Sequence, residues 1–273
     1  MEIEKVSILG CGWFGLPFAK HLVAKGYEVK GSTTSEQKLS ELKRDGIAPF
    51  LIDLNQGDDL PTDFFDTDVL LVNVPPRAKS ADAVNYVTKL KPIAEAAKGK
   101  IKHLVFISST GVFEDGNFAV DERDCPQPTT EAGKVLLEAE NLWKAYPQFS
   151  VTIIRFAGLL GPGRNLAKFF AGKTDVANGK APVNLITLDD CIGVCAHLLE
   201  TQKFGEIYHA VVPHHPSRSE FYSGLCEVSG MQPPHFKDEL LEWKQINAVN
   251  LPEKLGYVFK VQNWFEWMKQ PTL

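Results

Sequence analysis

The chain has 273 residues, of which 44% are hydrophobic and 23% are charged, so it can bury a sizeable core, and we expect one domain with a satellite lobe. The formal net charge is -5, and no Lys/Arg run favours a nucleic-acid backbone as a partner. No apolar run approaches the roughly 20 residues of a membrane span, and the segment after Met1 lacks the pattern of a secretion signal. We therefore expect a cytoplasmic protein that binds a small-molecule substrate, with neither nucleic acid nor membrane as a partner.

The cysteines and histidines do not form a metal-binding pattern. The five cysteines include no C-x-x-C pair, which favours reduced, buried thiols over a disulfide framework. Cys191 and Cys195 lie one turn apart on a predicted helix, and His214 and His215 lie in a polar loop, but neither pair has the further ligands of a metal site close by in the sequence. No metal site is predicted.

Short runs rich in β-branched residues alternate with amphipathic stretches along most of the chain. The runs are typical of strands buried on both faces of a parallel sheet, and they cover residues 6–10, 27–31, 48–53, 68–74, 103–109, 151–158 and 207–212. The amphipathic stretches predict helices near residues 15–25, 36–45, 82–98, 130–145 and 189–201. This alternation predicts an α/β fold built on a doubly wound parallel sheet of the Rossmann type.

Two segments break the alternation because they are richer in Gly, Pro and aromatic residues. We therefore expect a dinucleotide-binding domain over residues 1–158, with its sheet continued by 189–212. Residues 159–188 and 213–273 are expected to form a smaller C-terminal lobe that binds the substrate at the carboxyl edge of the sheet.

The first predicted strand leads directly into the sequence GCGWFG. Gly10, Gly12 and Gly15 form a G-x-G-x-x-G motif that opens an amphipathic helix, which is the context in which this motif binds the pyrophosphate of a dinucleotide. The N–H groups at the start of that helix, at Trp13 and Phe14, are expected to bind the phosphates. A glycine turn without a ligand is the alternative interpretation.

The second predicted strand ends in the sequence KGSTTS, without the carboxylate that usually holds the ribose 2'-hydroxyl of NAD. Ser32, Thr33 and Thr34 offer hydroxyl donors, and Lys30 and Lys38 lie close by in the sequence. These groups suit a 2'-phosphate and favour NADP over NAD. The alternative role of the serine and threonines is to cap the next helix.

Later strand ends supply the remaining expected cofactor contacts. Asp53 follows the third predicted strand and is expected to approach the adenine. Val74 and Pro75, in the sequence NVPP, are expected near the ribose and nicotinamide, and Ser108 at the end of the fifth predicted strand completes the set.

Five motifs together suggest a family: GCGWFG, LVFISSTGVFEDG, EAGKVLLEAE, IRFAGLLGPGR and LITLDDCIG. In order and approximate spacing they resemble the extended short-chain dehydrogenase/reductases of the NAD(P)-dependent epimerase/dehydratase superfamily, and in particular its atypical bacterial members. The resemblance implies chemistry on a carbonyl or sugar-nucleotide substrate. It also implies a serine that holds the substrate oxygen and a Tyr-x-x-x-Lys helix that supplies the acid/base. The oligomeric state is left open, with a homodimer as one option.

The resemblance places Ser109 at the serine position, because Val112 and Phe113 match the Val-Tyr pair that follows it in the family. Ser109 is therefore the expected catalytic residue, and a strand-end serine that bonds its own backbone is the alternative. On the next helix, Ala132 and Leu136 occupy the tyrosine and lysine positions. Neither side chain can move a proton.

A shifted register retains Lys134 as the lysine but puts Thr130 at the tyrosine position, and an alcohol is too weak an acid to substitute unaided. None of the six tyrosines is followed four residues later by a lysine. Ala132, Leu136, Ala139 and Trp143 share one face, so the helix can still pack on the sheet.

Two functional hypotheses remain open at this stage. In the first, the chain is an NADP-dependent enzyme in which another donor, such as Tyr222 or His215, replaces the tyrosine. In the second, it is an NADP-binding redox sensor or regulatory module without turnover. Arg164 and Lys168 are either contacts for an anionic substrate or solvated charges, and Asp189 and Asp190 are expected to cap a helix.

Overall fold

The computed structural model describes residues 3–56, 60–76 and 85–270. The chain divides into two compact units, each assembled from segments that are distant in sequence. The first unit contains Met1–Phe113, Pro126–Arg155 and Val194–Tyr208, and the second contains Glu114–Cys125, Phe156–Gly193 and His209–Leu273.

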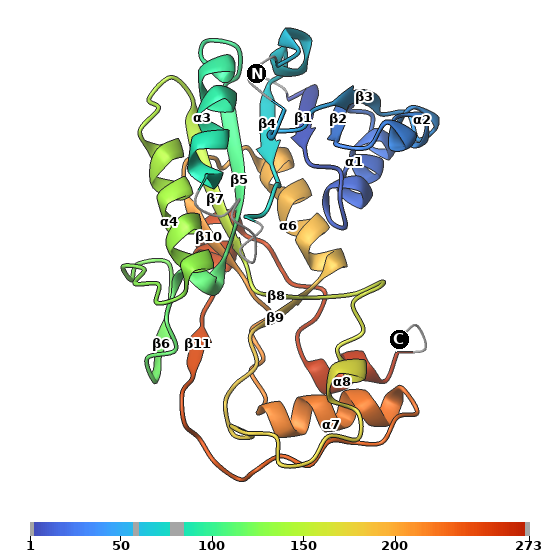
Figure 1. Cartoon of the computed structure of the whole chain (residues 1–273), viewed down its shortest axis with the longest axis vertical. Coiled ribbons are helices and arrows are strands. Elements are labelled where there is room, and N and C mark those ends of the chain that lie inside the picture. The colour runs from blue at the N-terminus through green and yellow to red at the C-terminus, as the bar shows by residue number, and fades with distance from the viewer. Residues whose placement is uncertain (1–2, 57–59, 77–84, 271–273) are drawn as a thin grey trace. The chain divides into compact units, whose positions relative to one another are not determined.

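The fold is organised around a seven-stranded parallel sheet with the strand order β10, β7, β5, β4, β1, β2, β3 (Figure 1). The strands are β1 (Lys5–Leu9), β2 (Glu28–Thr33), β3 (Ala48–Leu51), β4 (Val69–Val72), β5 (His103–Ser109), β7 (Ser150–Phe156) and β10 (Ile207–Ala210). Each coincides with a predicted strand, and the predicted α/β doubly wound class is confirmed. The strand order switches at β1, which pairs in parallel with β2 on one side and with β4 on the other. The strands before β4 in the chain lie on one side of this point, and β4 and the later strands lie on the other. The carboxyl ends of β1 and β4 therefore border the crevice where such sheets bind ligands.

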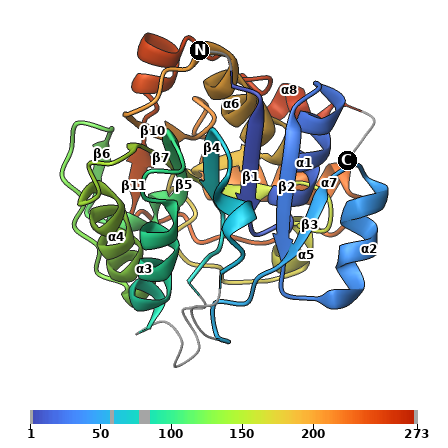
Figure 2. The same ribbon diagram turned by 90° about the horizontal axis from the view of Figure 1, so that it is seen from above.

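The helices of the sheet also follow the prediction: α1 (Gly15–Ala24), α2 (Glu36–Arg44), α3 (Tyr86–Ala97), α4 (Glu131–Lys144) and α6 (Leu188–Thr201). The first residues of the helix predicted near 82–98 lie outside the described part of the chain. Figure 2 shows α3 and α4 side by side on one face of the sheet, with α1 and α6 on the other. An ion pair of 3.7 Å between Lys25 and Glu200 links the ends of α1 and α6. Among the described helices, none is both long and apolar enough to cross a bilayer.

Burial explains why the strands form where they do. All four residues of β4 are buried, as are Val6, Ile8 and Leu9 of β1. In register, Val6 lies opposite Val69 and Ile8 opposite Leu71. A strand covered on both faces by helices reads as a continuous apolar run, and this is what made the sheet predictable.

The second unit contains short elements that the sequence did not predict. Two pairs of three-residue parallel strands form, β6 (Phe118–Val120) with β11 (Lys244–Ile246) and β8 (Gly158–Leu160) with β9 (Leu185–Thr187). This unit also contains the helices α5 (Ala167–Phe170), α7 (Arg218–Val228) and α8 (Trp264–Met268) and the π-helical turn η3 (Leu251–Leu255), and α6 begins in it. Phe221 of α7 packs edge-to-face on Trp264 of α8 at 5.4 Å between ring centroids. The three-residue strands and the helices of four and five residues carry too little periodicity to be recognised from sequence. Helix α7 has 11 residues and a capping box formed by Ser217 and Glu220, so its sequence did carry a signal that was missed.

The start of α6 corrects one sequence-based expectation. Thr187 Oγ1 accepts from the N–H of Asp190 at 3.2 Å, so Thr187 acts as the cap that we had assigned to the two aspartates. The buried carboxylate of Asp190 accepts from the Thr187 hydroxyl at 3.2 Å, and also from the Tyr257 hydroxyl at 2.8 Å and the N–H of Lys260 at 2.7 Å. It fastens a distant segment of the chain, a role that local sequence does not reveal.

Candidate functional site

The glycine loop between β1 and α1 is built to expose backbone at one point. Gly10 has a φ of +103°, and a Cβ there would lie 2.8 Å from the carbonyl oxygen of Asn73. A Cβ at Gly15 would lie 2.2 Å from the carbonyl oxygen of Gly10, so both positions require glycine. At Gly12 a Cβ would meet nothing within 4 Å among the described residues. The space in front of Gly12 is open, which fits the close approach of a pyrophosphate to bare backbone.

Neighbouring strands hold this loop in place. The N–H of Gly10 donates to Ser32 Oγ at 2.9 Å, and the N–H of Cys11 donates to the Ser32 carbonyl at 2.9 Å. Directly after β4, Asn73 Nδ2 donates to the Gly10 carbonyl at 3.2 Å. Ser32 therefore anchors the loop with its oxygen, while its hydroxyl hydrogen can still donate to a phosphate. The anchoring role of Asn73 was not predicted.

A pocket of about 270 Å³ opens beside the loop at the carboxyl ends of β1, β2, β3 and β4. Its size is near the lower limit for ligand pockets, which suits one part of a dinucleotide. The predicted cofactor residues that line it are Gly10, Gly12, Ser32, Thr33, Thr34, Asp53, Val74 and Pro75. Residues that are separate in sequence thus meet at one edge of the sheet.

Four predicted cofactor residues lie outside the described lining of this pocket: Trp13, Phe14, Gly15 and Ser108. Phe14 is buried and stacks on Phe18 at 5.4 Å, so only its backbone can serve a phosphate. The buried Ser108 hydroxyl donates to Glu140 Oε1 at 2.7 Å. The Ser108 side chain therefore points into the protein interior and not toward the pocket.

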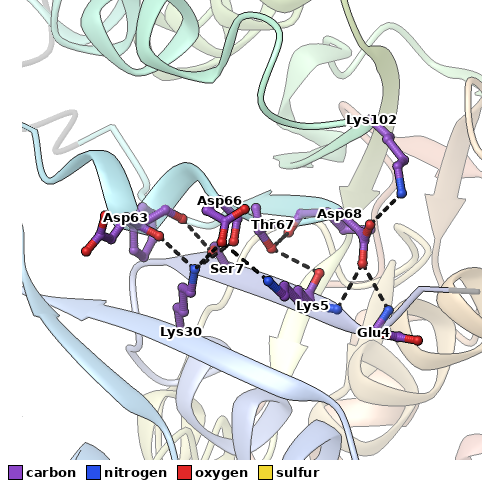
Figure 3. Close-up of polar contacts among 11 residues, drawn as sticks. Glu4, Lys5, Ser7, Lys30, Asp63, Asp66, Thr67, Asp68 and Lys102 are labelled. Atoms are coloured by element: carbon purple, nitrogen blue, oxygen red, sulfur yellow. Dashed lines mark hydrogen bonds and ion pairs between the residues drawn. The ribbon is translucent and has the colours of Figure 1, made fainter.

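The lysines near the pocket are not the pair expected from the sequence. Lys38 lines the pocket, and so does Lys89, which was not predicted. The buried Lys30 instead directs its Nζ at the carbonyls of Asp63 and Asp66, at 2.7 and 2.6 Å (Figure 3). A buried ammonium needs such partners. The prediction that Lys30 serves a 2'-phosphate is therefore wrong.

One tyrosine forms part of the pocket wall. Tyr86 opens α3, is buried, and donates its hydroxyl to the carbonyl of Val74 at 2.5 Å. Burial raises the pKa of Tyr86, which makes its phenol a poor acid near neutral pH. Tyr86 fixes the first turn of α3 to the end of β4.

Ser109 lies half-buried at the end of β5. Its Oγ accepts from the N–H of Gly111 at 3.1 Å and caps the short 3-10 turn η2 (Thr110–Val112). The backbone-bonding alternative is thus present in the structure. Because the oxygen accepts in this contact, the hydroxyl hydrogen can still donate to a substrate oxygen, so the two roles are compatible.

Helix α4 begins against the turn that follows Ser109. A Cβ at Gly133 would lie 2.4 Å from the carbonyl oxygen of Gly111, so the helix and the turn pack closely. Leu136, Ala139 and Trp143 are buried, as expected for an apolar helix face, while Ala132 is half-buried. The positions of the family's tyrosine and lysine therefore carry apolar side chains.

The shifted register on α4 finds no support in the contacts made by the described residues. Thr130 Oγ1 accepts from the N–H of Gly133 at 3.1 Å and caps the helix. Lys134 pairs on the exposed surface with Glu131 at 2.7 Å. Neither residue is arranged as an acid/base pair.

The remaining predicted residues lie in the second unit. Tyr222 stacks on Phe170 at 3.9 Å, and burial raises the pKa of its phenol. His215 Nδ1 is hydrogen-bonded to the carbonyl of Val183 at 3.0 Å, and burial lowers the pKa of the imidazole. Arg164 and Lys168 are exposed. The suggested roles of Tyr222 and His215 as proton donors stay predictions, and a raised pKa is unfavourable for Tyr222.

Comparison with known proteins now identifies the family. A family model described as NAD(P)H-binding matches residues 10–187. The chain belongs to this NAD(P)H-binding family. It is 35% identical to Protein YeeZ of Escherichia coli (strain K12) over 266 residues, which cover 94% of this chain and 96% of the relative.

Two solved structures are similar over nearly the whole chain. A putative NAD-dependent epimerase/dehydratase from Methylobacillus flagellatus is 25% identical, with a TM-score of 0.78 and coverage of 97% of this chain and 96% of that one. UDP-glucuronic acid 4-epimerase from Bacillus cereus, in complex with NAD, is 21% identical, with a TM-score of 0.80 and 97% coverage of both chains. The resemblance inferred from the motifs is confirmed, and the chain has an NAD(P)-binding, epimerase/dehydratase-like fold.

Proposed function

We propose that the chain binds NADP(H) in the pocket at the ends of β1 to β4 and acts on a carbonyl or sugar-nucleotide substrate whose oxygen is held by Ser109. The observation that carries the proposal is the space in front of Gly12, which none of the described residues fills, in a loop where a side chain at either of the other two glycines would clash. A pyrophosphate needs that combination of rigidity and bare backbone.

The preference for NADP over NAD is supported by the charges of the pocket. Its lining holds Lys38 beside the hydroxyl groups of Ser32, Thr33 and Thr34, and β2 ends without a carboxylate. A 2'-phosphate placed there meets donors and positive charge rather than repulsion. Asp53, on the neighbouring loop, is proposed to accept a hydrogen bond from the adenine.

On the substrate side, the proposal assigns the second unit the role of a substrate-binding lobe. When bound, the nicotinamide would exchange a hydride with the substrate, and Ser109 would orient the substrate oxygen by donating its hydroxyl hydrogen. The exposed Arg164 and Lys168 offer positive charge for an anionic group. A sugar nucleotide fits this chemistry, and a Bacillus cereus epimerase of similar fold was solved with UDP-glucuronic acid and NAD.

Ala132 and Leu136 favour a second candidate function, an NADP-binding redox sensor without turnover. Losing a positioned acid/base typically costs on the order of 10²–10⁴ in rate. Such a protein would use the bound cofactor to select a conformation.

The cofactor proposal is tested by fluorescence titration with NADPH and NADH. Gly12→Val is expected to abolish binding of both while leaving the unfolding temperature close to that of the original chain, because it fills only open space. Lys38→Gln should weaken NADPH by about tenfold, equivalent to about 1.4 kcal/mol, and leave NADH unchanged. Lys43→Gln, an exposed change on the same helix, is the matched control. Equal or tighter binding of NADH by the original chain contradicts the NADP assignment.

The two functions are separated by scanning a panel of carbonyl compounds and sugar nucleotides for cofactor oxidation. Oxidation that is lost in Ser109→Ala supports the enzyme. Tight NADPH binding without oxidation across the panel supports the sensor.

A further inference from the structure

A chain of side-chain contacts crosses one end of the cofactor pocket. Lys89 Nζ, on α3, donates to Asn55 Oδ1 at 2.5 Å, and Asn55 Nδ2 donates to Asp53 Oδ1 at 2.8 Å. All three residues line the pocket. The contacts join a helix on one side of the pocket to the loop after β3 on the other.

The donor and the acceptor of each hydrogen bond between these three side chains follow from their functional groups. An ammonium group only donates, so Lys89 must face the amide oxygen of Asn55. The amide nitrogen of Asn55 then points at Asp53, which as a carboxylate only accepts. Lys89 therefore favours one of the two orientations of the Asn55 amide.

The carboxylate of Asp53 is oriented unevenly by these contacts. Its Oδ1 receives both the side-chain nitrogen of Asn55 at 2.8 Å and the backbone N–H of Asn55 at 3.0 Å. Its Oδ2 receives a longer bond of 3.3 Å from Gln56 Nε2. An ionised carboxylate has about four acceptor positions. Asp53 can therefore accept a further hydrogen bond, chiefly at Oδ2.

The helix end of the chain of contacts is firmly placed. Tyr86, one turn before Lys89 on α3, is buried and bonded to the Val74 carbonyl at 2.5 Å. Through Lys89 on the same helix, the loop that carries Asp53 is therefore linked to the end of β4 across the pocket.

We propose that Lys89 is a positioning residue that acts through Asn55 on Asp53 and thereby sets the selectivity of the pocket for the purine base. The inference rests on the proposed binding of NADP(H). Adenine presents an amino group at position 6, which can donate a hydrogen bond to a carboxylate. Hypoxanthine presents an oxygen there, which a carboxylate repels. A site built to bond one group discriminates strongly against an analogue that leaves it unpaired.

The test compares dissociation constants for NADPH and for its hypoxanthine analogue, deamino-NADPH. The original chain is expected to prefer NADPH by about tenfold or more, since one hydrogen bond to a charged group is worth about that factor. Lys89→Met should bring the ratio of the two constants close to one, and Lys89→Arg should keep most of the preference. Lys91→Met, an exposed change on the same helix outside the described pocket lining, should leave the ratio unchanged.

The outcomes separate this inference from the proposed function. If Lys89→Met weakens both ligands equally and the ratio stays the same, Lys89 acts by general attraction or by stability, and the inference is wrong. If the original chain binds both ligands equally well, the inference fails while NADP(H) binding stands. If it binds neither ligand, the proposed function itself fails. Asn55→Leu breaks the same contacts at their midpoint, and it should also lower the ratio if Lys89→Met does not fold.

Discussion

Glu140 of α4 and Arg155 of β7 form a fully buried, bidentate ion pair. Arg155 Nε donates to Oε1 at 3.0 Å and Nη2 donates to Oε2 at 2.7 Å, with side-chain exposures of 1% for Arg155 and 0% for Glu140. Ser108 donates to the same carboxylate at 2.7 Å, and the guanidinium lies 5.2 Å from the ring centroid of Phe113. The helix that lacks the acid/base pair is thus bound to the sheet by charge as well as by apolar packing.

Removing one partner of this pair should be severely destabilising. Arg155→Met leaves a carboxylate buried without its counter-charge, and we expect a loss of about 3–5 kcal/mol in the free energy of unfolding. Urea denaturation measures it. The double change Glu140→Leu with Arg155→Met should recover most of the loss. Glu131→Gln removes an exposed pair and serves as the control, with an effect of at most about 1 kcal/mol. A comparable loss in the control would contradict the buried pair's special role.

Lys30 should contribute to stability and not to cofactor choice. Lys30→Met removes hydrogen bonds to the carbonyls of Asp63 and Asp66, and we expect a loss of about 1–3 kcal/mol in the free energy of unfolding. The ratio of the dissociation constants for NADPH and NADH should not change. Titration with both nucleotides, alongside Lys38→Gln, checks this. A shift of that ratio in Lys30→Met would show that Lys30 reaches the cofactor after all.

Stability should fall in mildly acidic solution because of two half-buried imidazoles. Burial and the neighbouring Lys102 lower the pKa of His103, which stacks on Phe204 at 3.9 Å, and burial also lowers the pKa of His215. As pH falls through the ordinary histidine pKa of about 6.5, the unfolded chain takes up protons that the folded chain does not. The free energy of unfolding should therefore decrease below that pH.

Denaturant unfolding at a series of pH values from neutral to mildly acidic measures this dependence. His103→Phe keeps an aromatic ring against Phe204 without a titrating group, so it should flatten the profile. An unchanged slope in this variant would mean that His103 titrates alike in the folded and unfolded chains.

Asp190 should stabilise the second unit through a distant segment. Asp190→Asn replaces an acceptor of hydrogen bonds from Tyr257 and from the backbone of Lys260 and Val261, leaving buried donors unpaired. We expect the free energy of unfolding to fall by at least about 2 kcal/mol in denaturant titrations. Asp189→Asn, an exposed neighbour, should change it by no more than about 0.5 kcal/mol. Equal effects would favour the capping role that we first assigned to both residues.

The sequence alone was sufficient to predict the sheet and the glycine loop. Strands such as Val69–Val72 are apolar throughout because both faces are covered, and the glycine spacing specifies a turn whose geometry is local. The absence of a Tyr-x-x-x-Lys helix was also readable, because it depends only on residue identity. The family followed from these local patterns.

Only the tertiary structure decided where individual polar side chains point. Lys30 lies close in sequence to Ser32, yet its ammonium group bonds carbonyls more than thirty positions away. Lys89 lies on α3 and reaches Asn55 on the loop after β3, across the pocket. Asp190 bonds Tyr257, 67 positions away, as well as Thr187 at the start of its own helix. Periodicity in a sequence reports which face of an element is buried, because burial repeats along the element. A hydrogen bond between distant residues leaves no such repeat, so the partners emerge only once the chain has brought them together.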